Sequence, residues 1–236
     1  MTWYQEWFGE EYLELYSHRD EHEARQQVAF VRGRFGAIDG PVLDLACGSG
    51  RHVQELKIAG YRVAGCDLSY TLLRTGVREY GTMPVTRADM RALPFCTASF
   101  AALVNFFTSF GYFAAEEENR GVVGEMARVL TPGALFLFDY LNVHHELEKL
   151  VQRETRGTPM GRVDIERWFD PSDRSFNKRI TIGDKRYLER VRGYDLAEIT
   201  DMFTTAGLHI DSAFGDFDGG AYARTSPRLI LMGRRR

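Results

Sequence analysis

The sequence predicts an α/β fold: a doubly wound, mostly parallel sheet of seven strands with an antiparallel last strand, and a small antiparallel sheet inserted late. Between residues 41 and 142, short apolar runs alternate with amphipathic segments of helical length. Parallel neighbouring strands need crossover connections of this length. The chain has 236 residues, of which 44% are hydrophobic, so it is long enough to bury a full core.

The first 40 residues are expected to form a helical cap. Residues 12–34 are compatible with one polar helix, and its expected inner face consists of Val28, Phe30, Val31 and Phe35. The start, WYQEWFGEEYLELYSHRD, is aromatic and acidic, and two interpretations stay open. It is either a helix that packs its rings on the sheet or a lid over a bound ligand.

The next segment reads as strand–helix–strand–helix–strand. The expected strands are VLDLA, RVAGCD and PVTRAD, and the helices between them cover residues 51–59 and 70–80, ended by Gly60 and Gly81. FAALVNFF then predicts a buried strand, and residues 116–130 an amphipathic helix that stops at Pro132 and Gly133. ALFLFDY is apolar almost throughout, as a central parallel strand requires.

The pattern changes after residue 142. RVDIERWFD, SFNKRITIG and KRYLERVRG alternate with a period of two and are separated by turn residues, which predicts an antiparallel sheet. A helix at 194–207 follows, and then two strands joined by a loop. The expected domains are a cap (1–40), a ligand-binding domain (41–142 with 193–236) and an inserted subdomain (143–192).

Composition and charge limit the classes of binding partner and the cellular locations that are expected. The net charge of −3 gives no general attraction for nucleic acid. No apolar run is long enough to span a membrane, and the first residues lack the basic start and apolar run of an export signal, so neither export nor a membrane anchor is expected. The three cysteines are odd in number and lack metal-binding spacing, which indicates a reducing, cytoplasmic location. The oligomeric state is not predicted.

The stretch VLDLACGSGRH indicates where a ligand binds. In open α/β sheets, ligands bind beyond the carboxyl ends of the strands, and Gly48 and Gly50 would let a ligand approach the backbone there. Three acids, Asp44, Asp67 and Asp89, fall in or at the ends of three successive strands. Because the ends of parallel strands meet at one edge of the sheet, these acids are expected to converge on a nucleoside-bearing ligand.

A nicotinamide dinucleotide is the alternative ligand. Its Gly-x-Gly-x-x-Gly turn would start at Gly48 and Gly50, but Val53 then occupies the third glycine position. That scheme also gives no function to an acid inside the first strand or to one after the third. The mismatch counts against the dinucleotide.

The stretches VLDLACGSGRH, VAGCDLS and TRADMRALPF resemble the first three motifs of the class I S-adenosylmethionine-dependent methyltransferases, which have a Rossmann-like sheet. The resemblance covers residues 41–142 and the final strand pair. It implies S-adenosylmethionine as cofactor. Asp44, with the backbone of Ala46 and Gly48, would face its methionine part, and Ser49 and Gly50 complete that loop.

The resemblance also places the adenosine. It implies that Asp67 holds the ribose hydroxyls, that Leu68 lies against the adenine, that Asp89 bonds the adenine amino group, and that Met90 packs on the ring. The fourth strand would put its last residues beside the sulfonium, namely Asn105 and Phe106. The family's nucleic-acid members that methylate amines carry Asn/Asp-Pro-Pro-aromatic there, whereas this chain has NFFTSFGYF, which disfavours transfer to a base amine.

The N-terminal segment is a candidate for covering the cofactor, as in related small-molecule methyltransferases. In this interpretation Tyr4, Tyr12 or Tyr16 lies over the sulfonium and Arg19 pairs with the methionine carboxylate.

Acceptor contacts are expected from residues after the fifth strand, with Tyr140 and His144 as the candidates for a catalytic role. Asn142, His145, Tyr222 and Arg224 could lie nearby. His144 and His145 have no third ligand at metal spacing, so no metal is expected.

The expected function is methyl transfer to an oxygen or nitrogen atom of a small molecule. The protein would chiefly align the acceptor about 3 to 3.5 Å from the methyl group, so no catalytic base is required. Three alternatives stay open: a methyltransferase for protein or RNA, a nicotinamide-dependent oxidoreductase, and a module that binds the cofactor without turnover.

Overall fold

The main sheet has seven strands in the order β10-β11-β5-β4-β1-β2-β3. The computed structural model describes residues 2–16 and 21–236. All strands are parallel except β11, which runs antiparallel to β5 and β10, so the predicted fold class is confirmed. The strands are β1 Pro41–Leu45, β2 Arg62–Asp67, β3 Val85–Arg87, β4 Phe100–Asn105, β5 Leu130–Leu141, β10 Leu208–Phe214 and β11 Arg228–Arg235.

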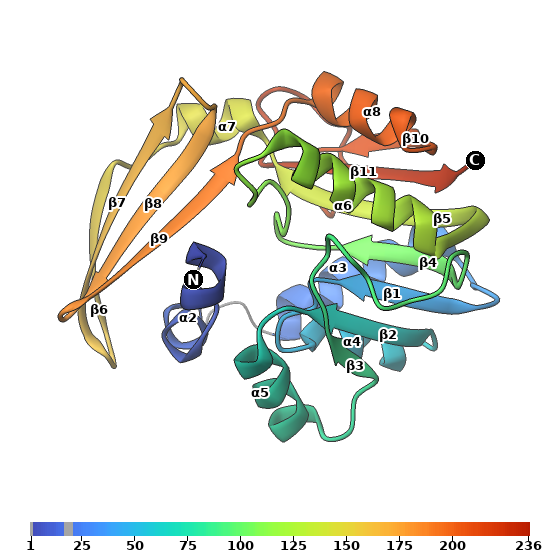
Figure 1. Cartoon of the computed structure of the whole chain (residues 1–236), viewed down its shortest axis with the longest axis horizontal. Helices are drawn as coiled ribbons and strands as arrows, with labels where there is room; N and C mark the ends of the chain where they lie inside the picture. Colours follow the sequence, from blue (N-terminus) through green and yellow to red (C-terminus); the bar gives the residue numbers. More distant parts are fainter. Residues whose placement is uncertain (1, 17–20) are drawn as a thin grey trace.

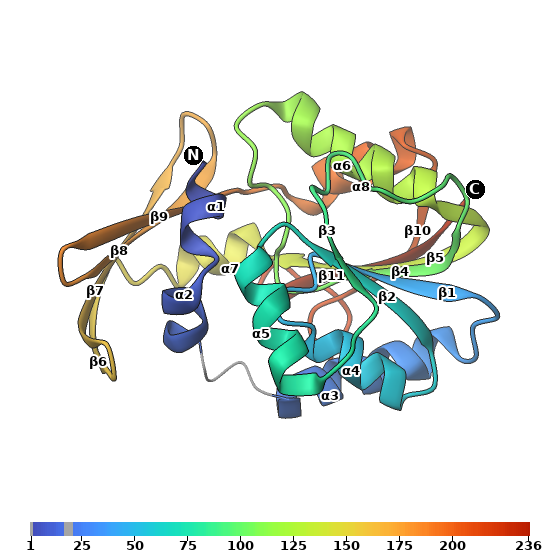
Figure 2. The same ribbon diagram turned by 60° about the horizontal axis from the view of Figure 1, so that its bottom comes forward.

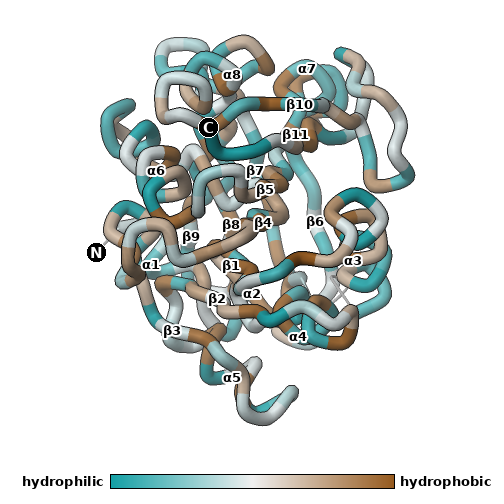
Figure 3. Tube along the Cα trace, turned by 90° about the vertical axis from the view of Figure 1, so that its right-hand side faces the viewer, coloured by the Kyte–Doolittle hydropathy of each residue, from teal (hydrophilic) through white to brown (hydrophobic). Residues whose placement is uncertain are grey.

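Helices cover both faces of this sheet (Figures 1 and 2). One face packs on α3 (Glu21–Phe35), α4 (Arg51–Ile58) and α5 (Tyr70–Tyr80). The other packs on α6 (Glu116–Val129) and α8 (Leu196–Thr205). The apolar strands therefore lie inside, between two layers of helices that carry both hydrophobic and hydrophilic residues (Figure 3). Within the described residues, no helix is long and apolar enough to cross a membrane.

A second sheet of four antiparallel strands stands beside the main one (Figure 1). It follows α7 (Val143–Glu148), and its strands are β6 Arg153–Thr158, β7 Gly161–Asp170, β8 Ser175–Ile182 and β9 Lys185–Arg192. The last three match the three predicted strands. The sequence did not predict β6, because RETRGT contains no apolar residue; it is an edge strand that half-faces solvent.

The first 35 residues divide between the two sheets. The helices α1 (Trp3–Trp7) and α2 (Glu10–Leu15) pack on the small sheet through Trp7 and Leu15, whereas α3 packs on the main sheet. The single helix expected over residues 12–34 is therefore wrong. Residues 17–20 lie outside the described part of the chain. In Figures 1 and 2, α1 and α2 lie between the small sheet and α5.

Candidate active site

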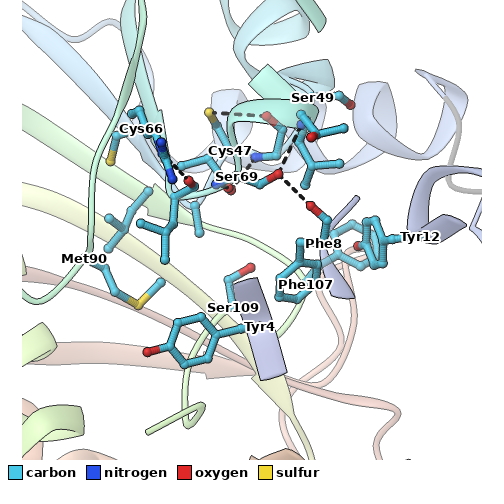
Figure 4. A pocket seen from close by; sticks show the side chains of 18 of the residues that line it. Tyr4, Phe8, Tyr12, Cys47, Ser49, Cys66, Ser69, Met90, Phe107 and Ser109 are labelled. Atoms are coloured by element: carbon cyan, nitrogen blue, oxygen red, sulfur yellow. Dashed lines mark hydrogen bonds between the residues drawn. The ribbon is translucent and has the colours of Figure 1, made fainter. Parts of the chain in front are cut away.

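A cavity of about 400 Å³ opens at the carboxyl ends of β1, β2 and β4 (Figure 4). This volume is within the usual range for small-molecule sites. The cavity is lined by most of the predicted cofactor residues: Tyr12, Tyr16, Asp44, Ala46, Gly48, Ser49, Asp67, Leu68, Asp89, Met90 and Phe106. Gly50 and Asn105 do not line it, and Arg19 lies outside the described residues.

The turn after β1 has a backbone conformation that favours glycine, and α5 packs closely against it. Ala46, Gly48 and Gly50 all have positive φ angles. A Cβ on Gly76 of α5 would lie 1.8 Å from the carbonyl oxygen of Ser49, so only glycine lets α5 pack against the turn. Gly50 faces Met83 rather than the cavity, which gives it a structural part. The backbone of the turn is thus fixed before any ligand binds.

The Asp44 carboxyl is 1% exposed and lies in the middle of the main sheet. Its neighbours in register are Gly65 and Val104, which offer no polar side chain. Among the described residues, its Oδ2 atom has no hydrogen-bond partner. Burial, together with the negative charge of Asp67, raises the pKa of Asp44 well above its ordinary value. An acid in this state would gain greatly from a bound cation.

Asp67 ends β2 with both oxygens directed at backbone amides. Oδ2 accepts from the N–H of Gly48 at 2.9 Å, and Oδ1 accepts from the N–H of Ser69 at 2.8 Å. Packing around the carboxyl raises its pKa, and the amide bonds oppose that shift. Because a carboxylate has about four acceptor positions, Asp67 can still accept from ligand hydroxyls.

Asp89 lines the cavity, but Arg91 holds its carboxylate. Oδ1 accepts from Arg91 Nε at 3.0 Å and Oδ2 from Arg91 Nη2 at 2.6 Å. These bonds keep the pKa of Asp89 below its ordinary value. The sequence did not identify this partner, although RADMR places it only two residues away. Asp89 is therefore neutralised by a neighbouring charge, unlike Asp44.

The two residues predicted beside the sulfonium at the end of β4 have different surroundings. Asn105 donates from Nδ2 to the carbonyl oxygen of Leu45 at 2.8 Å and ties β4 to β1 from inside the core. Phe106 lines the cavity and stacks on His52, with ring centroids 4.1 Å apart. His52 contacts Gln27 at 2.6 Å, and burial lowers the pKa of its imidazole well below the ordinary value. His52 is therefore uncharged at neutral pH.

The helices α1 and α2 form a lid over the cavity. Tyr4, Phe8, Tyr12 and Tyr16 line it from this side. The Ser69 hydroxyl donates to the carbonyl oxygen of Phe8 at 2.6 Å, which attaches the lid to the start of α5. The segment therefore packs as helices and also lines the cavity, and that its rings cover a bound cofactor stays a prediction.

The other edge of the lid is anchored on the small sheet. Glu189 of β9 accepts hydrogen bonds from the indole of Trp7 and from the hydroxyl of Tyr16. Lys178 of β8 lies 3.3 Å from Glu189 and also contacts the Tyr16 hydroxyl. The small sheet therefore sets where the Tyr16 ring meets the cavity.

The two candidate catalytic residues lie elsewhere. Tyr140 is fully buried, and its hydroxyl donates to the carbonyl oxygen of Arg192. Its side chain points from β5 into the core beneath α6 and α8, among the rings of Phe110 and Tyr194. The expected acceptor contact of Tyr140 is therefore wrong.

His144 also lies away from the cavity. It lies in the first turn of α7 and lines a separate open groove with Tyr222 and Arg224, 3.2 Å from the Arg224 guanidinium. Asn142 caps α7 and bonds the loop before β11, so the chain turns away from the cavity after β5. Among the described residues, no group of three or more His, Cys, Asp or Glu could hold a metal ion.

Comparisons with known proteins agree with this geometry. Residues 42–133 match the family model described as a methyltransferase domain. The chain is 28% identical over 117 residues to dTDP-4-amino-2,3,4,6-tetradeoxy-D-glucose N,N-dimethyltransferase of Saccharopolyspora spinosa, covering 50% of this chain and 46% of the relative. It is 35% identical over 112 residues to demethylmenaquinone methyltransferase of Renibacterium salmoninarum, covering 47% and 46%. The chain thus spans about half the length of these relatives.

The similarity of fold extends over nearly the whole chain. A solved S-adenosylmethionine-dependent methyltransferase from Clostridium acetobutylicum superimposes with a TM-score of 0.79 at 17% identity, covering 94% of this chain and 95% of that one. The match is too long to exclude the small sheet, which therefore lies at least in part inside the matched fold. Residues 42–133 thus match a methyltransferase domain, and the chain as a whole is similar in fold to this solved S-adenosylmethionine-dependent methyltransferase.

Proposed function

We propose that this protein transfers the methyl group of S-adenosylmethionine to an oxygen or nitrogen atom of a small molecule. The observation that carries the proposal is the buried Asp44 carboxylate, whose Oδ2 has no partner among the described residues and which lines the cavity. The methionine part of the cofactor brings the ammonium that this carboxylate lacks. The pyridinium cation of oxidised NAD carries no N–H that could donate a hydrogen bond to Asp44 Oδ2.

The remaining lining residues fit the rest of the cofactor. Asp67 keeps acceptor positions for the two ribose hydroxyls. Leu68 and Met90 supply apolar surface for the adenine. Asp89 is already paired with Arg91, so it suits a neutral amino group better than a second cation.

The bound cofactor supplies an electrophilic methyl group with a good leaving group. The chain's own residues then align the acceptor and exclude water. The lid places Tyr4, Phe8 and Tyr12 over the cavity, and their faces suit a neighbouring positive charge. His52 is stacked on Phe106 and contacts Gln27, so the proposal gives it no role as a catalytic base.

A small acceptor is favoured by the enclosed cavity. The two curated relatives named above are, by their names, a dimethyltransferase for a nucleotide-linked amino sugar and a methyltransferase for demethylmenaquinone. Small-molecule acceptors therefore suit this family, with proteins and RNA as the alternative. The cytoplasm stays our expected location, on the basis of three unpaired cysteines.

Calorimetry with S-adenosylhomocysteine and with NAD tests the cofactor. We expect binding of the sulfur compound alone, and Asp67→Ala should weaken it by about 1 to 3 kcal/mol, or roughly 5- to 150-fold. Asp201→Ala is the matched control, because that side chain is 71% exposed on α8. Binding of NAD alone would overturn the proposal.

Turnover is tested with methyl-labelled S-adenosylmethionine and a low-molecular-mass metabolite extract. Transfer of label into a small product supports the proposal. Label found only in added protein or RNA would assign a polymer acceptor. Binding of S-adenosylhomocysteine without any transfer would indicate a module that binds the cofactor without turnover.

A further inference from the structure

Two consecutive residues after β4 have a backbone conformation that favours glycine, although neither is glycine. Phe107 has a φ of 62° and Thr108 a φ of 58°. Left-handed residues with side chains are strained, and such strain persists only where the surroundings hold it, often at functional sites. Phe107 lines the cavity, and so does Ser109 just after the pair. The strained turn is thus part of the cavity wall.

An ion pair on β5 and β11 holds this turn. Asp139 is 1% exposed, and its Oδ1 accepts from Arg228 Nε at 2.7 Å. Its Oδ2 accepts from the N–H of Phe107 at 2.8 Å, and its carbonyl oxygen accepts from the N–H of Thr108 at 3.0 Å. Arg228 also donates from Nη2 to the Thr108 hydroxyl at 2.9 Å. We name this pair, Asp139 and Arg228, the clamp.

The turn lies at the end of the cavity where the methyl group is expected. The strand order β4-β1-β2-β3 puts Asp67 and Asp89 on one side of Asp44 and the turn on the other. If adenosine lies over β2 and β3, the turn after β4 is next to the reacting end. Phe107 and Ser109 of the turn line the cavity together with the lid residues Phe8 and Tyr4, and Figure 4 draws all four. The turn and the lid are therefore walls of the same cavity.

We infer that the Asp139–Arg228 clamp is a positioning pair for methyl transfer, which holds residues 107–109 as the wall against which the acceptor is aligned. This inference rests on the proposed function. Neither residue of the clamp lines the cavity. The clamp therefore acts through the turn and has no direct contact with the acceptor or the cofactor.

The geometry requires arginine in particular. The guanidinium reaches Asp139 with Nε and Thr108 with Nη2, and a lysine ammonium is a single point charge on a flexible stem. Arg228→Lys therefore keeps the charge but loses the double contact. Arg234 on the same strand is a matched control, because it pairs with the half-exposed Asp211 at the surface.

The test compares Arg228→Lys and Arg234→Lys with the unaltered protein. Label transfer from S-adenosylmethionine to the metabolite extract should show an apparent kcat, the rate at saturating S-adenosylmethionine and a fixed amount of extract, lowered roughly tenfold or more in Arg228→Lys, since misplacement by about 1 Å can slow transfer 100-fold. The KM for S-adenosylmethionine and the Kd for S-adenosylhomocysteine should stay within about threefold, because their expected contacts lie on other strands. Arg234→Lys should match the unaltered protein in all three.

A second variant tests whether the lost rate comes from backbone strain in the turn or from a general loss of protein stability. Glycine adopts positive φ without strain, so adding Thr108→Gly to Arg228→Lys should restore part of the lost kcat. An unchanged kcat in Arg228→Lys would overturn the inference. So would a parallel loss of kcat and S-adenosylhomocysteine affinity, or a double variant no better than Arg228→Lys.

Hydrogen exchange distinguishes failure of the positioning inference from failure of the proposed function. The amides of Phe107 and Thr108 should exchange faster in Arg228→Lys but not in Arg234→Lys. If the unaltered protein neither binds S-adenosylhomocysteine nor transfers label, the proposed function is wrong. Faster hydrogen exchange in Arg228→Lys would then show only that the clamp stabilises the turn. The inference that it positions the acceptor would be overturned.

Discussion

Replacing Asp44 by asparagine should make the free protein more stable and its cofactor binding weaker. The carboxyl is 1% exposed, and its Oδ2 has no partner among the described residues. Asparagine keeps the shape and removes the charge that burial disfavours. It also removes the charge that would bind the ammonium of the cofactor. A residue that only stabilises the fold would not give these opposite effects.

The expected magnitudes follow from the environment of Asp44. A hydrogen bond to a charged group contributes about 1.5 to 3 kcal/mol, so S-adenosylhomocysteine should bind roughly 10- to 150-fold more weakly. An unsatisfied buried group costs about 1 to 3 kcal/mol or more. For a protein of this size, each 1 kcal/mol shifts Tm by about 2 to 4 °C.

The pH dependence gives an independent check. Burial raises the pKa of Asp44 above its ordinary 3.8. The stabilising contribution of the protonated acid is fully present below pH 3.8 and is lost as the pH rises through the folded-state pKa. Asp44→Asn should therefore raise the Tm of the free protein at neutral pH, and the gain should shrink as the pH falls toward 3.8.

The assay compares the unaltered protein with Asp44→Asn. Calorimetry measures the affinity for S-adenosylhomocysteine, and thermal unfolding measures Tm. Asp195→Asn is the control, because Asp195 caps α8 and asparagine caps a helix equally well. An Asp44→Asn protein that binds S-adenosylhomocysteine with unaltered affinity would refute the assigned role of this carboxylate. A Tm that falls at neutral pH would refute the claim that the buried charge is unsatisfied.

Two further substitutions test the packing around the cavity. Gly76→Ala should lower the unfolding free energy by about 1 to 3 kcal/mol and weaken S-adenosylhomocysteine binding, because the new Cβ meets the Ser49 carbonyl; unaltered Tm and affinity would contradict the close approach. Tyr140→Phe should lower stability by about 1 kcal/mol through loss of the bond to Arg192, with affinity and transfer rate unchanged. A slower rate at unchanged Tm would instead return Tyr140 to the list of catalytic candidates.

The parts of the site that follow from strand order could be predicted from the sequence. Carboxyl ends of parallel strands meet at one edge, so acids in or at the ends of three successive strands must approach one another. Asp44, Asp67 and Asp89 do line one cavity. The same reasoning located the turn at Gly48 without any knowledge of its contacts.

The direction of side chains on a fully buried strand could not be predicted. Both faces of β5 are covered, so its apolar run shows no alternation that would tell which residues face the cavity. Tyr140 was expected near the acceptor and instead points into the core beneath α8. β6 was missed for the opposite reason, since an edge strand can consist of polar residues only.

The Asp139–Arg228 clamp could not be predicted from the sequence either. Asp139 and Arg228 meet because β11 inserts beside β5, and 89 residues separate them along the chain. Nothing local in NFFTSF indicates that Phe107 and Thr108 are left-handed, because neither glycine nor asparagine stands at those two positions. Such strain is visible only once the long-range partner is known.

The three acids at the strand ends differ in what already neutralises them, and this difference favours one orientation of the cofactor. Asp44 has an unpartnered oxygen, Asp67 accepts from two amides, and Asp89 is paired with Arg91. A ligand cation gains most where no positive partner exists, hydroxyls suit a carboxylate that keeps free acceptor positions, and a neutral amine suits one that is already paired. An ammonium on β1, a ribose on β2 and an adenine beyond it satisfy all three conditions. The reverse orientation would place the cation beside Arg91 and leave Asp44 buried without a partner.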